Sequence, residues 1–252
     1  MKVIYSHSFY PVYTSDPAAG AGRIEAVMNA LPAETELIEA EPATEAQIAL
    51  AHTMGHIEFV RQEGLYDIAA LAAGGAMQAA RLGLGSPAFG AIRPPGHHAS
   101  GDSCWGFCYF NNMAVALLTL KDEGLIETAT ILDVDLHYGD GNVDILGHRS
   151  WVKICNPSGS TRDSYLREVE TFIEAHPADI IGISAGFDHH IQDWGGLLLT
   201  RDYCAMGQMV ANSARENNGG CFAILEGGYN HDVIGQNAAA LMEGLSAHSP
   251  SE

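Results

Sequence analysis

The sequence predicts an α/β fold in which a mostly parallel sheet of about seven to eight strands lies between helices. Short apolar runs alternate along the chain with longer segments of helical periodicity. Such alternation is typical of strand–helix–strand units, whose strands run parallel. No change of composition and no long linker divides the 252 residues, so we expect one domain covering residues 1–252.

Seven segments are expected to form strands, because each is a short run rich in aliphatic, aromatic or β-branched residues. The segment 36–39 is the weakest of them. The segment 130–132 is mostly apolar, as expected for a strand that is buried on both faces of a parallel sheet. The expected strands are 3–5, 36–39, 88–92, 130–132, 151–155, 179–184 and 221–225.

The segments between these strands are expected to form helices. A loop at 6–22, rich in aromatic residues, proline and glycine, leads into the first of them, and Thr44 is a suitable N-cap for the second. The segment 68–82 is rich in alanine and contains Gly74 and Gly75, so this helix should pack closely on a neighbour. The expected helices are 23–31, 44–49, 68–82, 111–120, a helix from about 142, 163–175, 200–216 and 232–245.

Charge and composition narrow the class of protein. The formal net charge of −19 disfavours nucleic-acid binding, which requires clustered Lys and Arg, and favours cationic substrates. No apolar stretch approaches the ~20 residues of a membrane span, and the N-terminus lacks a signal-peptide pattern. Five scattered cysteines do not form a disulfide or zinc pattern. We therefore expect a cytoplasmic protein with reduced thiols and no membrane or nucleic-acid partner.

The stretch from Ile131 to Asp140 carries the most unusual combination of residues. Asp133, Asp135 and His137 alternate with apolar residues directly after an apolar run. Side chains two positions apart on an extended chain share a face, so two carboxylates and an imidazole should project together at the end of the strand. Burying this much negative charge is costly unless a cation or hydrogen-bond donors meet it. The stretch therefore predicts a metal site.

Three other strand ends carry polar residues. The segment 88–92 leads to His97 and His98 on a loop stiffened by two prolines, 179–184 leads to Asp188, and 221–225 leads to Tyr229 on a Gly-Gly turn. In a parallel sheet the carboxyl ends of the strands lie along one edge, where ligands collect. These side chains are therefore expected to meet there.

Their chemistry suits a catalytic metal centre. Asp135, His137 and Asp188 form a three-ligand set with an open position, which is typical of catalytic zinc, and ferrous iron is the alternative. His97 and His98 are then available for proton transfer to or from water.

Two further groups are expected beside this centre. Asp133 and Asp140 are the acids available to orient the two histidines. Tyr229 is placed to donate a hydrogen bond to a developing oxyanion.

Five motifs occur in a fixed order: RPPGHHA (93–99), GFCYFNN (106–112), DVDLH (133–137), SAGFD (184–188) and EGGY (226–229). In this order they resemble the zinc-dependent histone deacetylase and acetylpolyamine amidohydrolase family. The resemblance implies an arginase-like α/β fold and a metal-dependent amidohydrolase. Such an enzyme removes an acetyl group from an amine, for example acetyl-lysine or an acetylpolyamine.

The resemblance also implies roles for individual residues. It makes Asp135, His137 and Asp188 the ligands of Zn²⁺. It adds a structural K⁺ around Asp133, Asp135 and His137. It pairs His97 with Asp133 and His98 with Asp140, and it makes His98 the general base and acid. Tyr229 would contact the substrate carbonyl. Gly106 and Phe107 would line the acyl tunnel.

The chain departs from the family pattern between His137 and Asp188, where the interval is shorter than usual. The segment 151–164 must replace a longer one that normally carries a second tunnel aromatic and backbone ligands of the K⁺. The sequence does not place that second aromatic. We expect either a broad mouth or a wall donated by another subunit of a homo-oligomer.

Two other functions remain open. An arginase- or agmatinase-like ureohydrolase requires another acid two residues after His137, where this chain has Gly139. A pseudoenzyme would bind acyl-lysine or polyamine without turnover, although every catalytic position is filled. A further pair, His52 and His56, has a spacing that can hold a metal on a helix, but such pairs are common on exposed helix faces and we favour that interpretation.

Overall fold

The seven expected strands pair in one sheet. In the computed structural model, which describes residues 1–247, the strand order is β2-β1-β3-β7-β6-β4-β5. All six strand pairings are parallel, so the predicted α/β fold with a parallel sheet is confirmed. The strands are β1 (Lys2–Tyr5), β2 (Glu36–Glu39), β3 (Ala88–Gly90), β4 (Ala129–Asp133), β5 (Val152–Cys155), β6 (Ile180–Ala185) and β7 (Gly220–Leu225).

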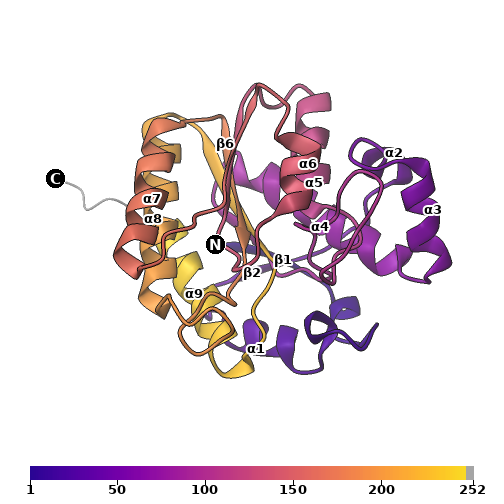
Figure 1. Ribbon diagram of the computed structural model, residues 1–252, viewed down its shortest axis with the longest axis horizontal. Helices are drawn as coiled ribbons and strands as arrows, with labels where there is room; N and C mark the ends of the chain where they lie inside the picture. The colour runs from indigo at the N-terminus through magenta and orange to yellow at the C-terminus, as the bar shows by residue number, and fades with distance from the viewer. Residues whose placement is uncertain (248–252) are drawn as a thin grey trace.

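Helices cover both faces of the sheet (Figure 1). Helices α4 and α5 pack together on one face, and α1, α7, α8 and α9 form a connected layer on the other. The helices are α1 (Arg23–Asn29), α2 (Glu45–Ile48), α3 (Met54–Gln62), α4 (Tyr66–Gly83), α5 (Asn112–Asp122), α6 (Asp140–Leu146), α7 (Arg162–Ala175), α8 (Thr200–Glu216) and α9 (His231–Ser246). Within residues 1–247, none of them has the length and apolar character required to cross a membrane.

The central strands β7, β6 and β4 are buried along their whole length, because helices cover both of their faces. Close packing of α4 agrees with its small residues. A Cβ on Gly74 would overlap the backbone carbonyl of Glu41, so a larger residue would push α4 away from that loop.

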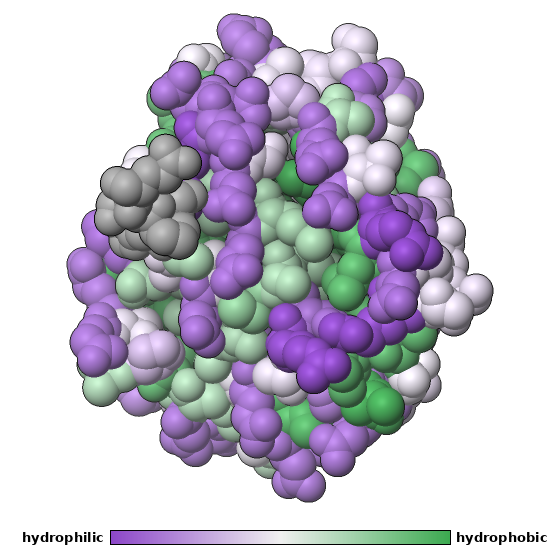
Figure 2. All heavy atoms as spheres, turned by 90° about the vertical axis from the view of Figure 1, so that its left-hand side faces the viewer, coloured by the Kyte–Doolittle hydropathy of each residue, from purple (hydrophilic) through white to green (hydrophobic). Residues whose placement is uncertain are grey.

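Figure 2, which views the side of the molecule that carries α7 and α8, shows hydrophilic side chains spread over this surface with hydrophobic ones between them.

Two features differ from the sequence-based expectation. Helix α2, which Thr44 caps, ends at Ile48, and Thr53 caps a new helix, α3, by accepting a hydrogen bond from the His56 backbone N–H. His52 therefore lies in the turn between two helices. Helix α6 begins at Asp140 rather than at about residue 142, so its first turn follows the metal-site segment directly.

The expectation that His52 and His56 lie on an exposed helix face was wrong. His52 is only 4% exposed and His56 only 3%. His52 Nδ1 lies 2.9 Å from the Ser100 carbonyl oxygen, and its Nε2 accepts the backbone N–H of Asn111 at 2.8 Å. His56 Nε2 lies 2.7 Å from the Tyr109 carbonyl oxygen. Both imidazoles therefore fasten the loop 100–111.

Candidate metal centre and active site

The strand order brings the polar strand ends together. Strands β3, β7, β6 and β4 are consecutive neighbours in the sheet. Their carboxyl ends lead to the loop with His97 and His98, to Tyr229, to Asp188 and to the segment 133–137, respectively. All of the polar groups singled out in the sequence therefore lie along one stretch of a single sheet edge.

Asp135, His137 and Asp188 form a compact group of metal-ligand atoms. One donor atom from each lies within 4.8 Å of the others. His137 Nδ1 is 3.2 Å from Asp135 Oδ1 and 3.0 Å from Asp188 Oδ2. Tetrahedral ligands at the usual zinc distances are about 3.3 Å apart, so these separations suit one ion of that size. Asp188 Oδ2 is buried and makes no hydrogen bond of acceptable geometry, although His137 Nδ1 faces it at 3.0 Å, so an ion placed between these two atoms would bind both.

The pKa values of this group reflect two carboxylates that lie close to one imidazole. Burial and the neighbouring carboxylate of Asp135 raise the pKa of Asp188 to about 7. The carboxylates of Asp135 and Asp188 raise the pKa of His137 to about 10. The His137 side chain is 38% exposed, so the donor set opens toward solvent on one side.

His97 is held deep in the site by Asp133. His97 Nδ1 lies 3.2 Å from Asp133 Oδ2, and the Asn142 side-chain amide donates to the same oxygen at 3.0 Å. Burial favours the neutral imidazole of His97, but the carboxylates of Asp135 and Asp133 outweigh it and raise its pKa well above the usual value. Asn142 lies in the first turn of α6.

His98 is oriented by Asp140 nearer the surface. His98 Nδ1 lies 2.7 Å from Asp140 Oδ1, and Trp105 Nε1 donates to Asp140 Oδ2 at 2.8 Å. The Trp105 indole also lies against the His98 ring, with centroids 3.9 Å apart. Burial and the neighbouring His97 lower the pKa of His98 to about 4. His98 is therefore the neutral member of the histidine pair, with Nε2 as its free acceptor.

Glu226 supports the histidine loop from β7. Its Oε2 accepts the backbone N–H groups of Gly96 at 2.6 Å and of His97 at 3.2 Å. Burial raises the pKa of Glu226 to about 7. His97, Cys108 and Glu226 also have donor atoms within 4.8 Å of one another. His97 already faces Asp133, and Glu226 already accepts two backbone N–H groups. We therefore interpret this second cluster as a support that holds the histidine loop in place, and not as a second metal site.

Gly106 and Phe107 form a strained turn over His98. Their φ angles are +59° and +68°, in the left-handed region that residues other than glycine adopt only at an energetic cost. A Cβ on Gly106 would overlap the His98 ring, so this position requires glycine. Phe107 packs edge-on against Tyr229, with ring centroids 6.0 Å apart and an interplanar angle of 83°.

The structure thus brings all ten of the predicted site residues to one sheet edge or to the loops above it. Sequence reasoning missed four further residues with contacts to them: Trp105, Asn142, Trp194 and Glu226. Glu226 stood inside a quoted motif and Trp105 directly before Gly106, so their positions in the chain gave a signal. Trp194 gave none, because a single tryptophan in a loop has no periodicity to interpret.

The family model for the histone deacetylase domain matches residues 18–165 and 147–245. The chain belongs to the histone deacetylase family. It is 32% identical to a probable deacetylase of Archaeoglobus fulgidus, over 77% of this chain and 69% of the relative. It is 26% identical to a histone deacetylase-like amidohydrolase of Pseudomonas aeruginosa, over 87% of this chain and 73% of that protein. The predicted family is therefore confirmed.

Other comparisons agree with this assignment. The chain is 30% identical to the acetylpolyamine amidohydrolase of Mycoplana ramosa, over 63% of this chain and 56% of the relative. The crystal structure of the HDA15 HD domain superposes with a TM-score of 0.83, covering 99% of this chain and 90% of that chain at 24% identity. At that level of identity the likeness establishes the deacetylase fold.

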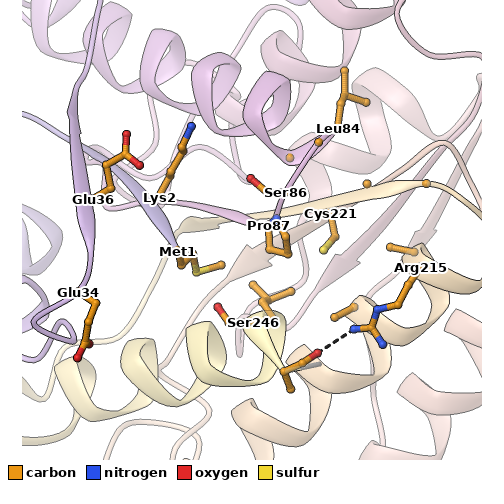
Figure 3. Close-up of a pocket in the computed structure, with 18 residues that line it drawn as sticks. Met1, Lys2, Glu34, Glu36, Leu84, Ser86, Pro87, Arg215, Cys221 and Ser246 are labelled. Atoms are coloured by element: carbon orange, nitrogen blue, oxygen red, sulfur yellow. Dashed lines mark hydrogen bonds between the residues drawn. The ribbon is translucent and has the colours of Figure 1, made fainter. Parts of the chain in front are cut away.

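A cavity of about 550 Å³ lies at the opposite edge of the sheet, at the amino ends of β1 and β7 (Figure 3). Lys2, Ser86, Arg215 and Cys221 are among the residues around it, and Arg215 donates to the backbone carbonyl of Ala247 at 2.8 Å. No residue of the candidate metal centre lines this cavity. The cavity is therefore separate from the candidate active site, despite its volume.

Proposed function

We propose that this protein hydrolyses the amide bond of an N-acetylated or N-acylated amine, with acetyl-lysine and acetylpolyamines as the candidate substrates. The observation that carries the proposal is the pairing of His98 with Asp140 beside an open three-ligand group. Relatives described as a deacetylase and as an acetylpolyamine amidohydrolase support the same reaction class.

The proposed ion is Zn²⁺, held by Asp135, His137 and Asp188, with Fe²⁺ as the alternative. Membership of the histone deacetylase family supports a metal, and the buried Asp188 Oδ2, which faces His137 Nδ1 without a hydrogen bond, fits one. When bound, such an ion supplies Lewis-acid chemistry, polarising the substrate carbonyl and lowering the pKa of water. A structural K⁺ near the segment 133–137 remains a prediction.

His98, the histidine paired with the partly exposed Asp140, is proposed to move the protons. The Asp140 carboxylate fixes the Nδ1–H tautomer of His98, so that His98 Nε2 can accept a proton from the attacking water. The water oxygen forms a bond to the carbonyl carbon. His98 then returns the proton to the nitrogen as the C–N bond breaks, releasing the carboxylic acid, which keeps the second proton of the water, and the amine; in solution that proton passes to the amine, giving carboxylate and ammonium. His97, whose charged form is favoured by Asp133, stabilises negative charge on the reacting atoms.

Tyr229 is proposed to stabilise the carbonyl oxygen as it becomes negative. Burial raises the pKa of Tyr229, so its hydroxyl stays protonated and able to donate a hydrogen bond at neutral pH. A positioned donor of this kind contributes to the rate because it binds the transition state more strongly than the ground state.

A binuclear ureohydrolase site is disfavoured by the local packing. Such a site requires an acid at position 139, and a Cβ on Gly139 would overlap the carboxylate of Asp133. An acid there could not be accommodated without moving Asp133 away from His97. A binding protein without turnover is the second alternative, and only an activity measurement separates it from an enzyme.

The deciding experiment measures amine release by the zinc-reconstituted protein from acetylputrescine, acetylspermidine and an acetyl-lysine peptide. We expect turnover of at least one substrate by the wild type and none by Asp188→Ala. Guanidino compounds such as arginine and agmatine should release no urea. Urea release, or the absence of any amine release from a protein that carries its metal, would refute the proposed reaction.

A further inference from the structure

We infer that Trp194 forms the second aromatic wall of the substrate site and selects substrates with an extended methylene chain. The inference rests on the proposed function for the nature of the substrate. The second aromatic wall would then come from the loop that follows Asp188, and not from the shortened segment 151–164.

The indole of Trp194 contacts two groups of the active site. It stacks on the Tyr229 ring, with centroids 4.0 Å apart and an interplanar angle of 24°. It also meets the His137 ring nearly at a right angle, at 88°, with centroids 6.0 Å apart. Phe107 contacts the same Tyr229 ring edge-on. Trp194, Tyr229 and Phe107 thus form one aromatic surface that adjoins the metal-ligand group.

Trp194 is nevertheless 55% exposed. An indole carries one of the largest apolar surfaces of any side chain, and leaving half of it in water beside a metal centre forgoes much of the stabilisation that burial would give. A ligand that reaches from solvent to the metal would cover this surface. Since the neighbouring groups are rings, the portion of the ligand that lies against them should be apolar and slender, as an unbranched methylene chain is.

The position of Trp194 is fixed by backbone contacts rather than by the indole alone. Its own N–H donates to Asp193 Oδ1 at 2.8 Å. Asp193 Oδ2 accepts the backbone N–H groups of both Tyr229 and Asn230, each at 2.8 Å. The loop is tied at its other side by the Gly195 N–H, which donates to the Asp188 carbonyl at 2.7 Å. Asp193 therefore connects the loop that carries Trp194 to the turn that carries Tyr229.

The shortened segment 151–164 does not fill the space beside the candidate metal centre. A recess of about 400 Å³ lies between residues 156–160 and the loop 189–197, with Asp135 at its inner side. The short segment lines it with Asn156, Pro157, Ser158, Gly159 and Ser160. The aromatic side chain in its lining is Tyr138, which is 60% exposed. Tyr138 is therefore the competing candidate for the wall.

The test compares the binding of two hydroxamates, acetohydroxamic acid and octanohydroxamic acid, to the zinc-reconstituted protein by calorimetry. Both carry the same chelating group, and only the second carries a chain long enough to lie against an aromatic wall. We expect Trp194→Ala to weaken the octanoyl ligand roughly tenfold. The acetyl ligand should change by less than about twofold. Trp194→Phe should retain most of the affinity for the long ligand.

Ile191→Ala is the matched control, since Ile191 is exposed in the same loop, and should leave both affinities unchanged. Equal weakening of both ligands by Trp194→Ala would reduce Trp194 to a support for the metal centre and overturn the inference. The same holds if neither ligand is affected, or if Tyr138→Ala rather than Trp194→Ala discriminates between them. Should Trp194→Ala fail to fold, Trp194→Ser, which also removes the apolar surface, replaces it with the same expected outcomes. A failure of the proposed hydrolysis would leave this binding difference measurable.

Discussion

His98 and Asp140 form a hydrogen-bonded pair, with Nδ1 of the imidazole 2.7 Å from Oδ1 of the carboxylate. The other carboxylate oxygen is held by Trp105, so the acid cannot turn away from the histidine without losing a second hydrogen bond. Asp140 is also the first residue of α6, where the partial positive charge of the helix N-terminus favours its ionised form. The pair therefore presents a neutral His98 with one defined tautomer.

His98→Ala is expected to lower kcat on the order of 10²–10⁴-fold, which is the usual contribution of general acid–base catalysis. The variant should keep its metal, because His98 is not one of the three proposed ligands. Asp140→Asn should cause a smaller loss, since the imidazole remains but its tautomer is no longer fixed. Steady-state kinetics together with metal analysis checks this. Near-normal turnover by His98→Ala would show that another group moves the proton.

One divalent metal per chain is expected after reconstitution, because Asp135, His137 and Asp188 can hold one ion, whereas His97 and Glu226 of the second cluster are engaged with Asp133 and with backbone N–H groups. Asp188→Ala should lose that metal during dialysis, whereas Asp140→Asn should retain it. Elemental analysis of the dialysed proteins measures the difference. Two metals per wild-type chain, or an unchanged metal content in Asp188→Ala, would contradict the assignment of the ligands.

Tyr229→Phe is expected to lower kcat on the order of 10²–10³-fold, as the removal of one oxyanion donor does. The phenyl ring preserves the stacking with Trp194 and the contact with Phe107. Binding of octanohydroxamic acid should therefore persist to within a few-fold. A variant that loses catalysis and hydroxamate binding together would indicate that the substitution disturbed the site as a whole.

His52 is expected to make the stability of the fold depend on pH. Burial, followed by the neighbouring His56, lowers the pKa of His52 from 6.5 to about 3. Below pH 6.5 the unfolded chain therefore takes up a proton at His52 that the folded chain does not. The stabilising contribution is fully present above pH 6.5 and decreases as the pH falls toward the folded value. Between about pH 7.5 and about pH 5.5 the loss amounts to about 1.4 kcal/mol.

Urea unfolding at these two pH values, compared between wild type and His52→Gln, measures this contribution. The variant should lose less stability on acidification than the wild type does. His148 is exposed, and His148→Gln should behave as the wild type. An identical pH dependence of wild type and His52→Gln would mean that the buried imidazole is protonated in the folded state or that the unfolded chain does not titrate there.

Substrate charge is expected to affect kcat/KM through the formal net charge of −19. Acetylputrescine should react more slowly as the salt concentration rises from about 0.05 M to about 0.5 M, because the distance over which ions screen the attraction falls from ~14 Å to ~4 Å. A neutral acetamide of the same chain length should show little change. Equal salt dependence of both substrates would remove electrostatic attraction as a factor in substrate choice.

The sequence by itself determined the sheet and the position of the site. Apolar strands that alternate with helices form a parallel sheet, and the carboxyl ends of such strands share one edge. Asp135, His137 and Asp188 therefore had to approach one another once their strands became neighbours. These conclusions depended on local periodicity and on connection rules, both of which can be read along the chain.

The tertiary structure alone decided which groups surround that site. Trp194 stacks on Tyr229, Glu226 holds the loop before His97, and His52 is buried under the loop 100–111. Each contact joins residues that are distant in the sequence, and its geometry depends on how two loops pack. A loop tryptophan or a turn histidine looks the same in the sequence whether it faces water or a partner. Local patterns specify the direction of side chains within a strand or helix, whereas the packing of loops against one another is specified only by the assembled fold.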